Sequence, residues 1–560
     1  MPSKTPSHSL DRNSPRPVGL FPALMFLRRH ALFLGILLAA SVSYFIILFQ
    51  SQTHVHSDEA IIGLMGKHIL EGQYHPFYMY GQTYNAGAAW EAYLAGLSFA
   101  VFDVGVIPLK SCIVVLSLAC LVLFYAMGHR LYGRRTAVLA ALAFALSPSL
   151  LKWHFQVRGY SWYFLSLPIL VSLFWSIDSS SPPKRTKTFL FGLVSGISVW
   201  CLELVLTPVA ALWLLLALRR KLSLRNAALG AFGLAAGYAP AIVFNLTHQF
   251  SNWREIFVER SSGVSSLFYP ATFVEIFVQE MPKLFGPDTV LWYYPEKPAS
   301  GYVFYGIAMV AVAAAILPFL RAPSRIRQAL GGGSSDEDKD LLMLILIAAC
   351  FVPYLIASPR VPGYFMGGCF FLAVLTGRLL ARCFAFSAFL PRLIGVAVLS
   401  ALLLVGVGVL ISTGQRNEIE TLTLNNAGNL NLVRIPGADL DGVEGYLRQN
   451  EISSVQTTVS FVYPLQFESG EKLAISDAIL GWDRRIYPST VPWREPRADQ
   501  RTAFIVETDS SLPVSVEAAF AKARRPPPRI AKFGALTVID AKPISHVRFR
   551  QESTGGEMSD

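Results

Sequence analysis

Long apolar stretches recur along the first three quarters of this chain, and they constrain its fold more than any other feature. They lie at residues 31–49, 106–127, 136–151, 161–177, 189–218, 227–246, 301–320, 341–357, 365–380 and 393–411. A helix of about 20 apolar residues crosses the hydrocarbon core of a bilayer, and the stretch at 189–218 is long enough for two helices, which gives about eleven spans. The sequence therefore predicts a polytopic α-helical membrane protein.

The charged residues agree with this topology. They make up 15% of the chain, whereas about a quarter of an average soluble protein is charged. Arg and Lys are concentrated in short loops between the apolar stretches, for example at 130–135, 184–187 and 219–225. Because basic loops stay in the cytoplasm, these loops are placed inside and the intervening loops outside. The net charge of +11 is explained by these loops and does not indicate nucleic-acid binding.

The two ends of the chain differ from the membrane domain at 29–412, whose long outer loops are expected at 50–105 and 247–300. Residues 1–28 are polar and rich in Pro and Ser, which predicts a disordered cytoplasmic tail. Residues 413–545 alternate between strand-like and helix-like stretches, which predicts a small extracytoplasmic α/β domain. The strand-like stretches are 455–463, 502–507 and 535–539, and the helix-like ones are 442–449 and 514–523. Residues 546–560 are expected to form a loose tail.

The loop after the first apolar stretch carries a dense group of polar side chains. Asp58 and Glu59 are adjacent carboxylates near the predicted membrane boundary, and Tyr80, Gln82 and Glu91 follow in the same loop. A carboxylate in a partly dry cleft is suited to act as a general base, with or without a bound divalent ion. Neighbouring aromatic and amide groups suit a sugar ligand. Acidic residues also favour the first turn of a helix, so a purely structural role stays open.

Further candidates lie in other predicted outer segments. Glu91 and Glu203 are acids at the outer ends of apolar helices, where a charge is either functional or a solvated cap. Arg158 and Arg360 lie in outer loops, against the positive-inside trend. A guanidinium group binds phosphate in a fork geometry, and a polyprenyl phosphate is the natural phosphate at this face of a membrane. A lipid-headgroup contact or a structural ion pair is the alternative. Tyr160, beside Arg158, is a candidate helper.

These motifs resemble those of the GT-C fold glycosyltransferases. The likeness is strongest to the bacterial relatives of protein O-mannosyltransferases and to lipid A aminoarabinose transferases. The motifs are SDEA at 57–60, YGQ at 80–82, WEAY at 90–93, RGY at 158–160, and PR at 359–360 followed by Tyr364. In the last motif three residues separate the arginine from the tyrosine, which departs from the Pro-Arg-Tyr pattern of the family. The resemblance covers about residues 30–400 in layout and residues 57–97 more specifically.

The resemblance implies an inverting glycosyltransferase in a bacterial inner membrane, with a cytoplasmic N-terminus. It would move a hexose or pentose from a polyprenyl-phosphate donor to an envelope glycan, lipid or protein acceptor on the outer face. Its partners are then the lipid-linked donor and membrane lipid. The sugar, the acceptor, the oligomeric state and the participation of a divalent metal ion stay open.

The resemblance also implies roles for individual residues. Asp58 is expected to be the catalytic base, and Glu59 its helper or, with Asp58, a metal ligand. Arg158 and Arg360 are expected to bind the donor phosphate. The residues expected to bind or orient substrate are Tyr80, Gln82, Glu91, Tyr160 and Glu203.

Two other classes of protein stay open. A transporter or flippase for lipid-linked glycans tends to show inverted repeats and polar groups at mid-membrane. This sequence has no visible repeat, and its unusual charges cluster in outer loops, which favours the enzyme. A non-catalytic membrane scaffold is the other class, and it is expected to tolerate Asp58→Asn.

Overall fold

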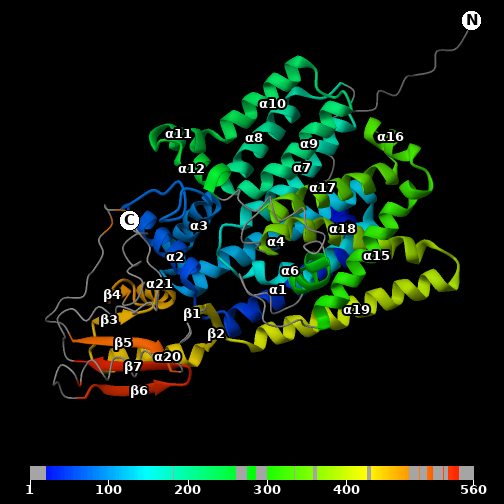
Figure 1. Cartoon of the computed structure of the whole chain (residues 1–560). Helices are drawn as coiled ribbons and strands as arrows, with labels where there is room; N and C mark the ends of the chain where they lie inside the picture. The colour runs from blue at the N-terminus through cyan, green and yellow to red at the C-terminus, as the bar shows by residue number, and fades with distance from the viewer. Residues whose placement is uncertain are drawn as a thin grey trace, which may run out of the picture.

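The computed structural model of the chain describes residues 20–180, 182–259, 274–285, 299–332, 335–356, 362–424, 430–477, 488, 491, 501–508, 521 and 527–541. It shows a helical membrane body, two shorter helices at one end of it, and a small domain of strands and helices beside them (Figure 1).

Seven helices in the described ranges are long and apolar enough to cross a membrane. They lie within α1 (Leu20–Ser51), α4 (Val106–Tyr132), α7 (Ser161–Asp178), α15 (Ala299–Arg321), α17 (Asp336–Ile356), α18 (Met366–Ala385) and α19 (Phe389–Gln415). An eighth span results if α10 (Leu224–Gly237) and α11 (Ala239–Thr247), bent by 58°, are counted as one. The chain is thus a multi-pass membrane protein by the length and composition of its helices.

The predicted number of about eleven spans is not confirmed, because a span of the usual kind needs about 20 apolar residues. Three of the predicted spans are shorter helices, namely α5 (Arg134–Leu146), α8 (Arg185–Cys201) and α9 (Leu206–Leu218). They have 13, 17 and 13 residues. α1 begins at Leu20, inside the segment predicted to be a disordered tail.

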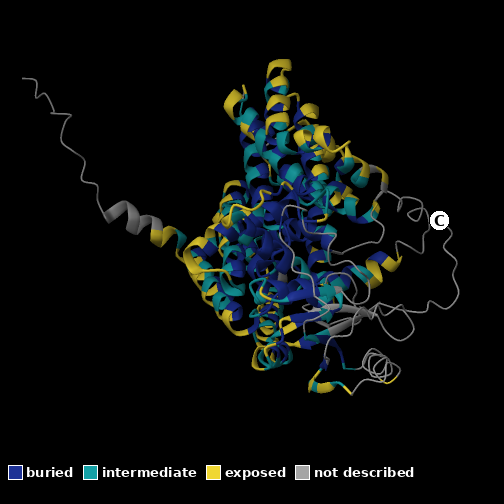
Figure 2. Ribbon diagram, turned by 90° about the vertical axis from the view of Figure 1, so that its left-hand side faces the viewer, coloured by how far each residue is buried: buried dark blue, intermediate teal, exposed yellow. Residues whose placement is uncertain are grey.

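The core of the membrane body is formed around α7 and α18. In each of them 78% of the residues in the most apolar stretch are buried, whereas only 22% are buried in α19. Buried residues gather at the centre of the molecule and exposed ones at its periphery (Figure 2). An apolar helix that is buried on most sides is a core element, and one with an exposed apolar face is placed against lipid. α7 therefore gives a rigid support to the loop that precedes it.

Two helices follow α1 at one end of the membrane body. They are α2 (Ser57–Leu70) and α3 (Ala86–Phe102), and both lie in the outer loop expected at 50–105. The acidic residues in the first turn of α2 complement the partial positive charge at a helix N-terminus. Ser57 is the first residue of α2, and its Oγ donates a hydrogen bond to the Ser460 carbonyl oxygen at 3.0 Å.

The described residues of the C-terminal region include two sheets and the helices α20 and α21, so the expectation of mixed strands and helices is confirmed. β1 (Glu418–Leu424) and β2 (Leu430–Pro436) form an antiparallel pair. The five-stranded sheet has the order β4-β3-β5-β7-β6, with β3 parallel to both neighbours and the remaining pairs antiparallel. Its strands are β3 (Ser454–Thr457), β4 (Ala474–Asp477), β5 (Thr502–Glu507), β6 (Arg529–Phe533) and β7 (Leu536–Ala541). The helices are α20 (Gly437–Gln449) and α21 (Val459–Glu468).

One strand prediction in this region was wrong over half its length. Of the predicted strand at 455–463, only the first residues belong to β3, and α21 begins at Val459. A short apolar stretch has no periodicity that separates a strand from a buried helix. The predicted strands at 502–507 and 535–539 correspond to β5 and β7. The predicted helix at 514–523 and the tail at 546–560 lie outside the described residues, apart from residue 521.

The C-terminal domain packs directly on α2. A methyl group at Gly63 would lie 2.6 Å from the ring of Phe467, so only glycine allows this approach. At the C-terminal end of α2, His68 Nε2 lies 3.0 Å from Glu471 Oε1, and Lys67 also pairs with Glu471. Before α2, the Val55 amide donates to Glu468 Oε1 at 3.3 Å. These contacts fix the helix whose first turn carries Asp58 and Glu59.

Candidate functional site

Glu59 is buried and engaged in several contacts. Its Oε2 lies 3.2 Å from Nζ of Lys110, a buried residue of α4. Its Oε1 accepts a hydrogen bond from the Val157 amide at 3.1 Å, and the His56 amide donates to Oε2 at 3.3 Å. Glu59 therefore joins α2, α4 and the loop before α7, as a structural anchor does.

Asp58, by contrast, is open to solvent. Its side chain is 43% exposed, and its Oδ2 lies 3.8 Å from Nη1 of Arg158. An accessible carboxylate beside a buried guanidinium group has the properties of a base next to an anion-binding group.

Arg158 is held in place by His56. The Nε and Nη2 atoms of Arg158 lie 2.9 Å and 2.6 Å from Nε2 of His56. Nε2 accepts here, so the imidazole ring is neutral and carries its proton on Nδ1. Burial lowers the pKa of His56 well below its usual value, and the cationic Arg158 and Lys110 lower it further. A neutral His56 thus orients the guanidinium group so that Nη1 lies on the side of Asp58.

Glu91 of α3 holds the loop that carries Arg158. Its two carboxylate oxygens accept hydrogen bonds from the amides of Gly159 at 2.7 Å and Ser161 at 2.9 Å. Burial raises the pKa of Glu91 to about 7, although these amides act in the opposite direction. Glu91 is buried, so the structure gives it a positioning role at the N-terminus of α7.

The loop itself leaves no room for a side chain at Gly159. This residue has a φ of +85°, and a methyl group there would lie 2.2 Å from Oδ1 of Asn85. Nδ2 of Asn85 also donates to the Arg158 carbonyl oxygen at 3.3 Å. The backbone on both sides of Arg158 is therefore fixed by α3 and by Asn85, the residue before α3.

Tyr160 completes the arrangement. Burial raises the pKa of its hydroxyl, Tyr364, Asp58 and Tyr84 act in the same direction, and Arg158 acts against them. These groups therefore lie close enough to the phenol to act on it electrostatically. We call Asp58, Tyr84, Arg158, Tyr160 and Tyr364 the Asp58 cluster. Three of the predicted site residues, Asp58, Arg158 and Tyr160, are brought together in it.

Tyr80 lies elsewhere. Its hydroxyl is 3.1 Å from Nδ1 of His68, whose Nε2 contacts Glu471 of the C-terminal domain. His68 is ten residues after Asp58 on α2, which corresponds to about 15 Å along the helix. Tyr80 is therefore part of a network that joins the first outer loop to the C-terminal domain, not of the Asp58 cluster.

Glu203 and Gln82 lie outside the contacts of the Asp58 cluster described above. Glu203 begins a short helix, η2 (Glu203–Val205), and raises the pKa of Tyr78, on which burial has the larger effect. Within the described part of the chain, Tyr78 Oη and Gln82 Oε1 are buried without a hydrogen-bond partner. Trp90 Nε1 is in the same situation. Buried polar atoms in proteins nearly always have partners, so these three atoms are candidates for binding a polar ligand.

The predicted metal ligands do not fit a shared metal site. No three His, Cys, Asp or Glu side chains among the described residues are placed to hold an ion. Glu59 is engaged by the ammonium group of Lys110, which opposes a second cation at the same carboxylate. Arg360 lies outside the described residues, so its predicted role stays a prediction.

Two residues of the site were missed by the sequence analysis. Lys110 is a cation inside the apolar stretch 106–127, and an ionisable residue in such a stretch usually has a partner, so this signal was present. His56 carries no comparable signal, because its role depends on a contact with Arg158 over 102 residues of chain.

Comparison with known proteins shows which solved structures share this fold. No protein-family model and no curated protein sequence match the chain. Among solved structures, it is similar to ArnT from Cupriavidus metallidurans bound to undecaprenyl phosphate. The identity is 14%, the TM-score is 0.59, and the match covers 91% of this chain and 98% of that one. The apo form of ArnT matches with 14% identity and a TM-score of 0.57, over 91% of this chain and 97% of that one.

A more distant match is the oligosaccharyltransferase from Archaeoglobus fulgidus tethered with an acceptor peptide. It has 12% identity and a TM-score of 0.50, and the match covers 80% of this chain and 64% of that one. Identities this low show the fold alone. The chain has the GT-C fold of membrane glycosyltransferases, as its motifs predicted.

Proposed function

We propose that this protein is an inverting glycosyltransferase that uses a polyprenyl-phosphate sugar as donor. It acts at the outer face of a bacterial inner membrane, where it transfers the sugar to an envelope glycan, lipid or protein. The fold supports this proposal, since the ArnT structure with the same fold contains bound undecaprenyl phosphate. The observation that carries it is the accessible Asp58 carboxylate 3.8 Å from the buried Arg158 guanidinium group.

The proposed reaction assigns one step to each of these groups. An acceptor hydroxyl or amine attacks the anomeric carbon, and Asp58 takes its proton. The bond between that carbon and the phosphate oxygen breaks, and the phosphate leaves with the electron pair. Arg158 binds the phosphate and stabilises its growing negative charge. Attack opposite to the leaving group inverts the anomeric centre.

Other side chains support this chemistry without taking part in proton transfer. His56 and Glu91 position Arg158, as their contacts with its side chain and loop indicate. Tyr78, Gln82 and Glu203 are proposed to bind sugar hydroxyls, because two of them carry buried polar atoms without a partner among the described residues. Arg360 is proposed as a second phosphate ligand on its sequence motif. No step in this scheme uses a metal ion, since Glu59 is occupied by Lys110.

The test is sugar transfer by purified protein in liposomes. The donors are radiolabelled polyprenyl-phosphate sugars, and the acceptors are fractions of the bacterial envelope. Asp58→Asn is expected to lose transfer by about 100-fold or more, the usual range for a general base, while donor binding is kept. Arg158→Ala is expected to lose donor binding.

Asp103→Asn is the matched control. It makes the same chemical change at an exposed acid at the end of α3 and is expected to transfer sugar normally. Undiminished transfer by Asp58→Asn contradicts the assignment of the base. Movement of labelled lipid across the bilayer without sugar transfer contradicts the enzyme and supports a flippase.

A further inference from the structure

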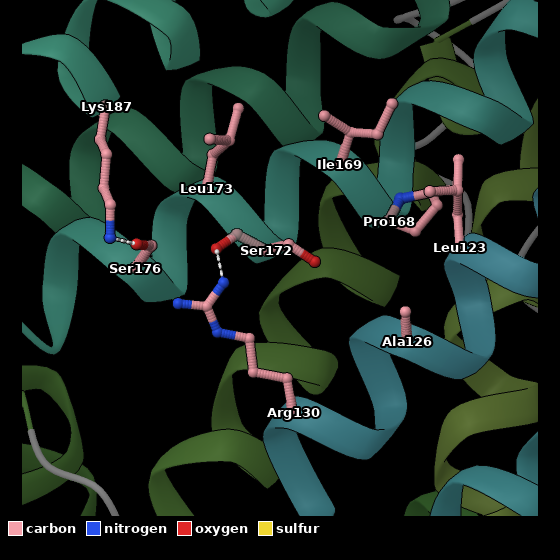
Figure 3. A pocket seen from close by; sticks show the side chains of 9 residues that line it. All are labelled: Leu123, Ala126, Arg130, Pro168, Ile169, Ser172, Leu173, Ser176 and Lys187. Carbon is pink, nitrogen blue, oxygen red and sulfur yellow. Dashed lines mark hydrogen bonds between the residues drawn. The ribbon is translucent and has the colours of Figure 1, made fainter. Parts of the chain in front are cut away.

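A cavity of about 320 Å³ lies between α4, α7 and α8 (Figure 3). It is lined by Leu123, Ala126, Arg130, Pro168, Ile169, Ser172, Leu173, Ser176 and Lys187. Arg130 and Lys110 are twenty residues apart on α4, which corresponds to about 30 Å along the helix, close to the thickness of the hydrocarbon core. Because Lys110 contacts Glu59, the cavity lies near the opposite face of the membrane.

Two cations from different helices converge in this cavity. Nη1 of Arg130, near the end of α4, donates to the Ser172 carbonyl oxygen at 3.4 Å. Nζ of Lys187, near the start of α8, donates to Oγ of Ser176. Ser172 and Ser176 are one turn apart on α7, so both cations contact the same stretch of this helix. Figure 3 shows both side chains directed toward α7 from opposite neighbours.

The cavity has no acidic side chain to balance these charges. Among the nine lining residues, all in the described part of the chain, the charged ones are Arg130 and Lys187. Arg130 is exposed and Lys187 partly exposed, so both can be reached from outside the protein. Two accessible cations without an acid favour an anionic ligand.

Apart from the two cations and the two serines, the lining is apolar. Leu123 and the exposed Ala126 come from α4, and Pro168, Ile169 and Leu173 come from α7. An apolar groove next to two cations at a membrane boundary is complementary to a phospholipid, which joins an anionic phosphate to a hydrocarbon chain. Basic pockets between membrane helices on the cytoplasmic side are known sites for lipid headgroups.

We propose that this cavity binds one anionic phospholipid. Its headgroup phosphate lies between Arg130 and Lys187, and its acyl chain lies along Leu123, Ala126 and Ile169. The positive-inside rule places the neighbouring basic loops, and with them this lipid, at the cytoplasmic leaflet. The lipid contacts three helices, including α7, whose other end carries the loop with Arg158.

The test measures lipid binding to delipidated full-length protein in detergent by native mass spectrometry. The probes are dioleoyl phosphatidylglycerol and dioleoyl phosphatidylcholine, which share their chains and differ in headgroup charge. Wild type is expected to bind phosphatidylglycerol at least tenfold more tightly. The double variant Arg130→Gln with Lys187→Gln is expected to lose this preference.

The matched control removes two cations from the same end of the membrane body. Arg134→Gln with Arg135→Gln changes exposed residues at the start of α5 that do not line the cavity, and it is expected to keep the preference. Equal loss in both double variants overturns the proposal, because it shows attraction by surface charge alone. An absence of preference in wild type overturns it as well.

A second variant tests the apolar part of the site without changing any charge. Ala126→Trp fills the groove and is expected to weaken phosphatidylglycerol binding at least tenfold, with an unchanged unfolding temperature in lipid-free detergent. Inorganic phosphate is the competing source of the same anion. Wild-type binding by Ala126→Trp, or full displacement of the lipid by millimolar phosphate, overturns a lipid as the ligand.

Discussion

The buried pair formed by Lys110 and Glu59 allows the most direct test of the structure. Their side chains are only 4% and 2% exposed, and Nζ lies 3.2 Å from Oε2. At this distance two unit charges attract by about 5 kcal/mol for an effective dielectric constant of about 20. Removing one partner of a buried pair typically costs about 3–5 kcal/mol, because the other charge stays buried without compensation. We therefore expect Lys110→Met to lower the free energy of unfolding by about 3–5 kcal/mol.

A double-mutant cycle in detergent micelles measures this effect. Unfolding is followed by tryptophan fluorescence for Lys110→Met, Glu59→Gln and the variant with both changes. The combined variant contains no uncompensated charge, so its loss of stability is expected to be smaller than the sum of the single losses by about 1–3 kcal/mol. Sugar transfer is measured on the same samples, at a temperature at which all of them are folded.

Two results would refute this reasoning. The first is a Lys110→Met variant as stable as wild type, or single losses that simply add. The second concerns activity: if Glu59 acted directly in catalysis, the combined variant would not recover the transfer lost in Lys110→Met or Glu59→Gln. A structural anchor predicts that stability and transfer recover together.

Three further predictions follow from the site and the domain contact. Gly159→Ala is expected to abolish sugar transfer in a transfer assay. Gly133→Ala is the control, because Gly133 has a similar φ of +81° but no atom within 4 Å of the added methyl group, and it is expected to lose only stability. Glu91→Gln keeps only one of the two oxygen atoms that accept hydrogen bonds from the loop. It is expected to lower the free energy of unfolding by about 1–3 kcal/mol, as an unfolding experiment measures, and to weaken donor binding. Burial and a neighbouring carboxylate raise the pKa of Glu444 to about 8, and the pKa of His54 is also raised, since nearby carboxylates outweigh its burial. Groups whose pKa is raised in the folded state stabilise that state at low pH, so docking of the C-terminal domain is expected to weaken as the pH rises from about 5 to about 8. Limited proteolysis measures this change, and Glu444→Gln is expected to remove most of it. A digestion pattern that does not depend on pH contradicts the prediction.

The membrane helices were predictable because each corresponds to a continuous apolar stretch of the sequence. What the sequence did not show is which helices cross the membrane and which form the core. α18 and α19 are both apolar, yet 78% of one and 22% of the other are buried in their most apolar stretch. Lipid and protein interior are alike in polarity, so composition alone cannot separate them. The difference depends on packing between segments distant in the chain.

Those residues of the candidate site that belong to a sequence motif were predictable. Asp58, Arg158 and Tyr160 were chosen from motifs, and the structure brings them together. Tyr80 was chosen in the same way, but its hydroxyl contacts His68 beside the C-terminal domain. Its role depends on how that domain docks on α2, which no local pattern records. The same reason hides His56, whose partner is 102 residues away.

The division of labour between Asp58 and Glu59 follows from helix geometry. Consecutive residues of an α-helix are separated by about 100° around its axis, so two adjacent carboxylates at its start cannot face the same environment. Because the C-terminal domain and the membrane body fix the orientation of α2, Glu59 points to Lys110 and Asp58 to solvent and Arg158. An acidic pair at this position therefore supplies one buried anchor and one accessible carboxylate, which is the base in the proposed function. It follows that Asp58→Asn should remove catalysis and leave the fold intact, whereas Glu59→Gln should weaken the fold first.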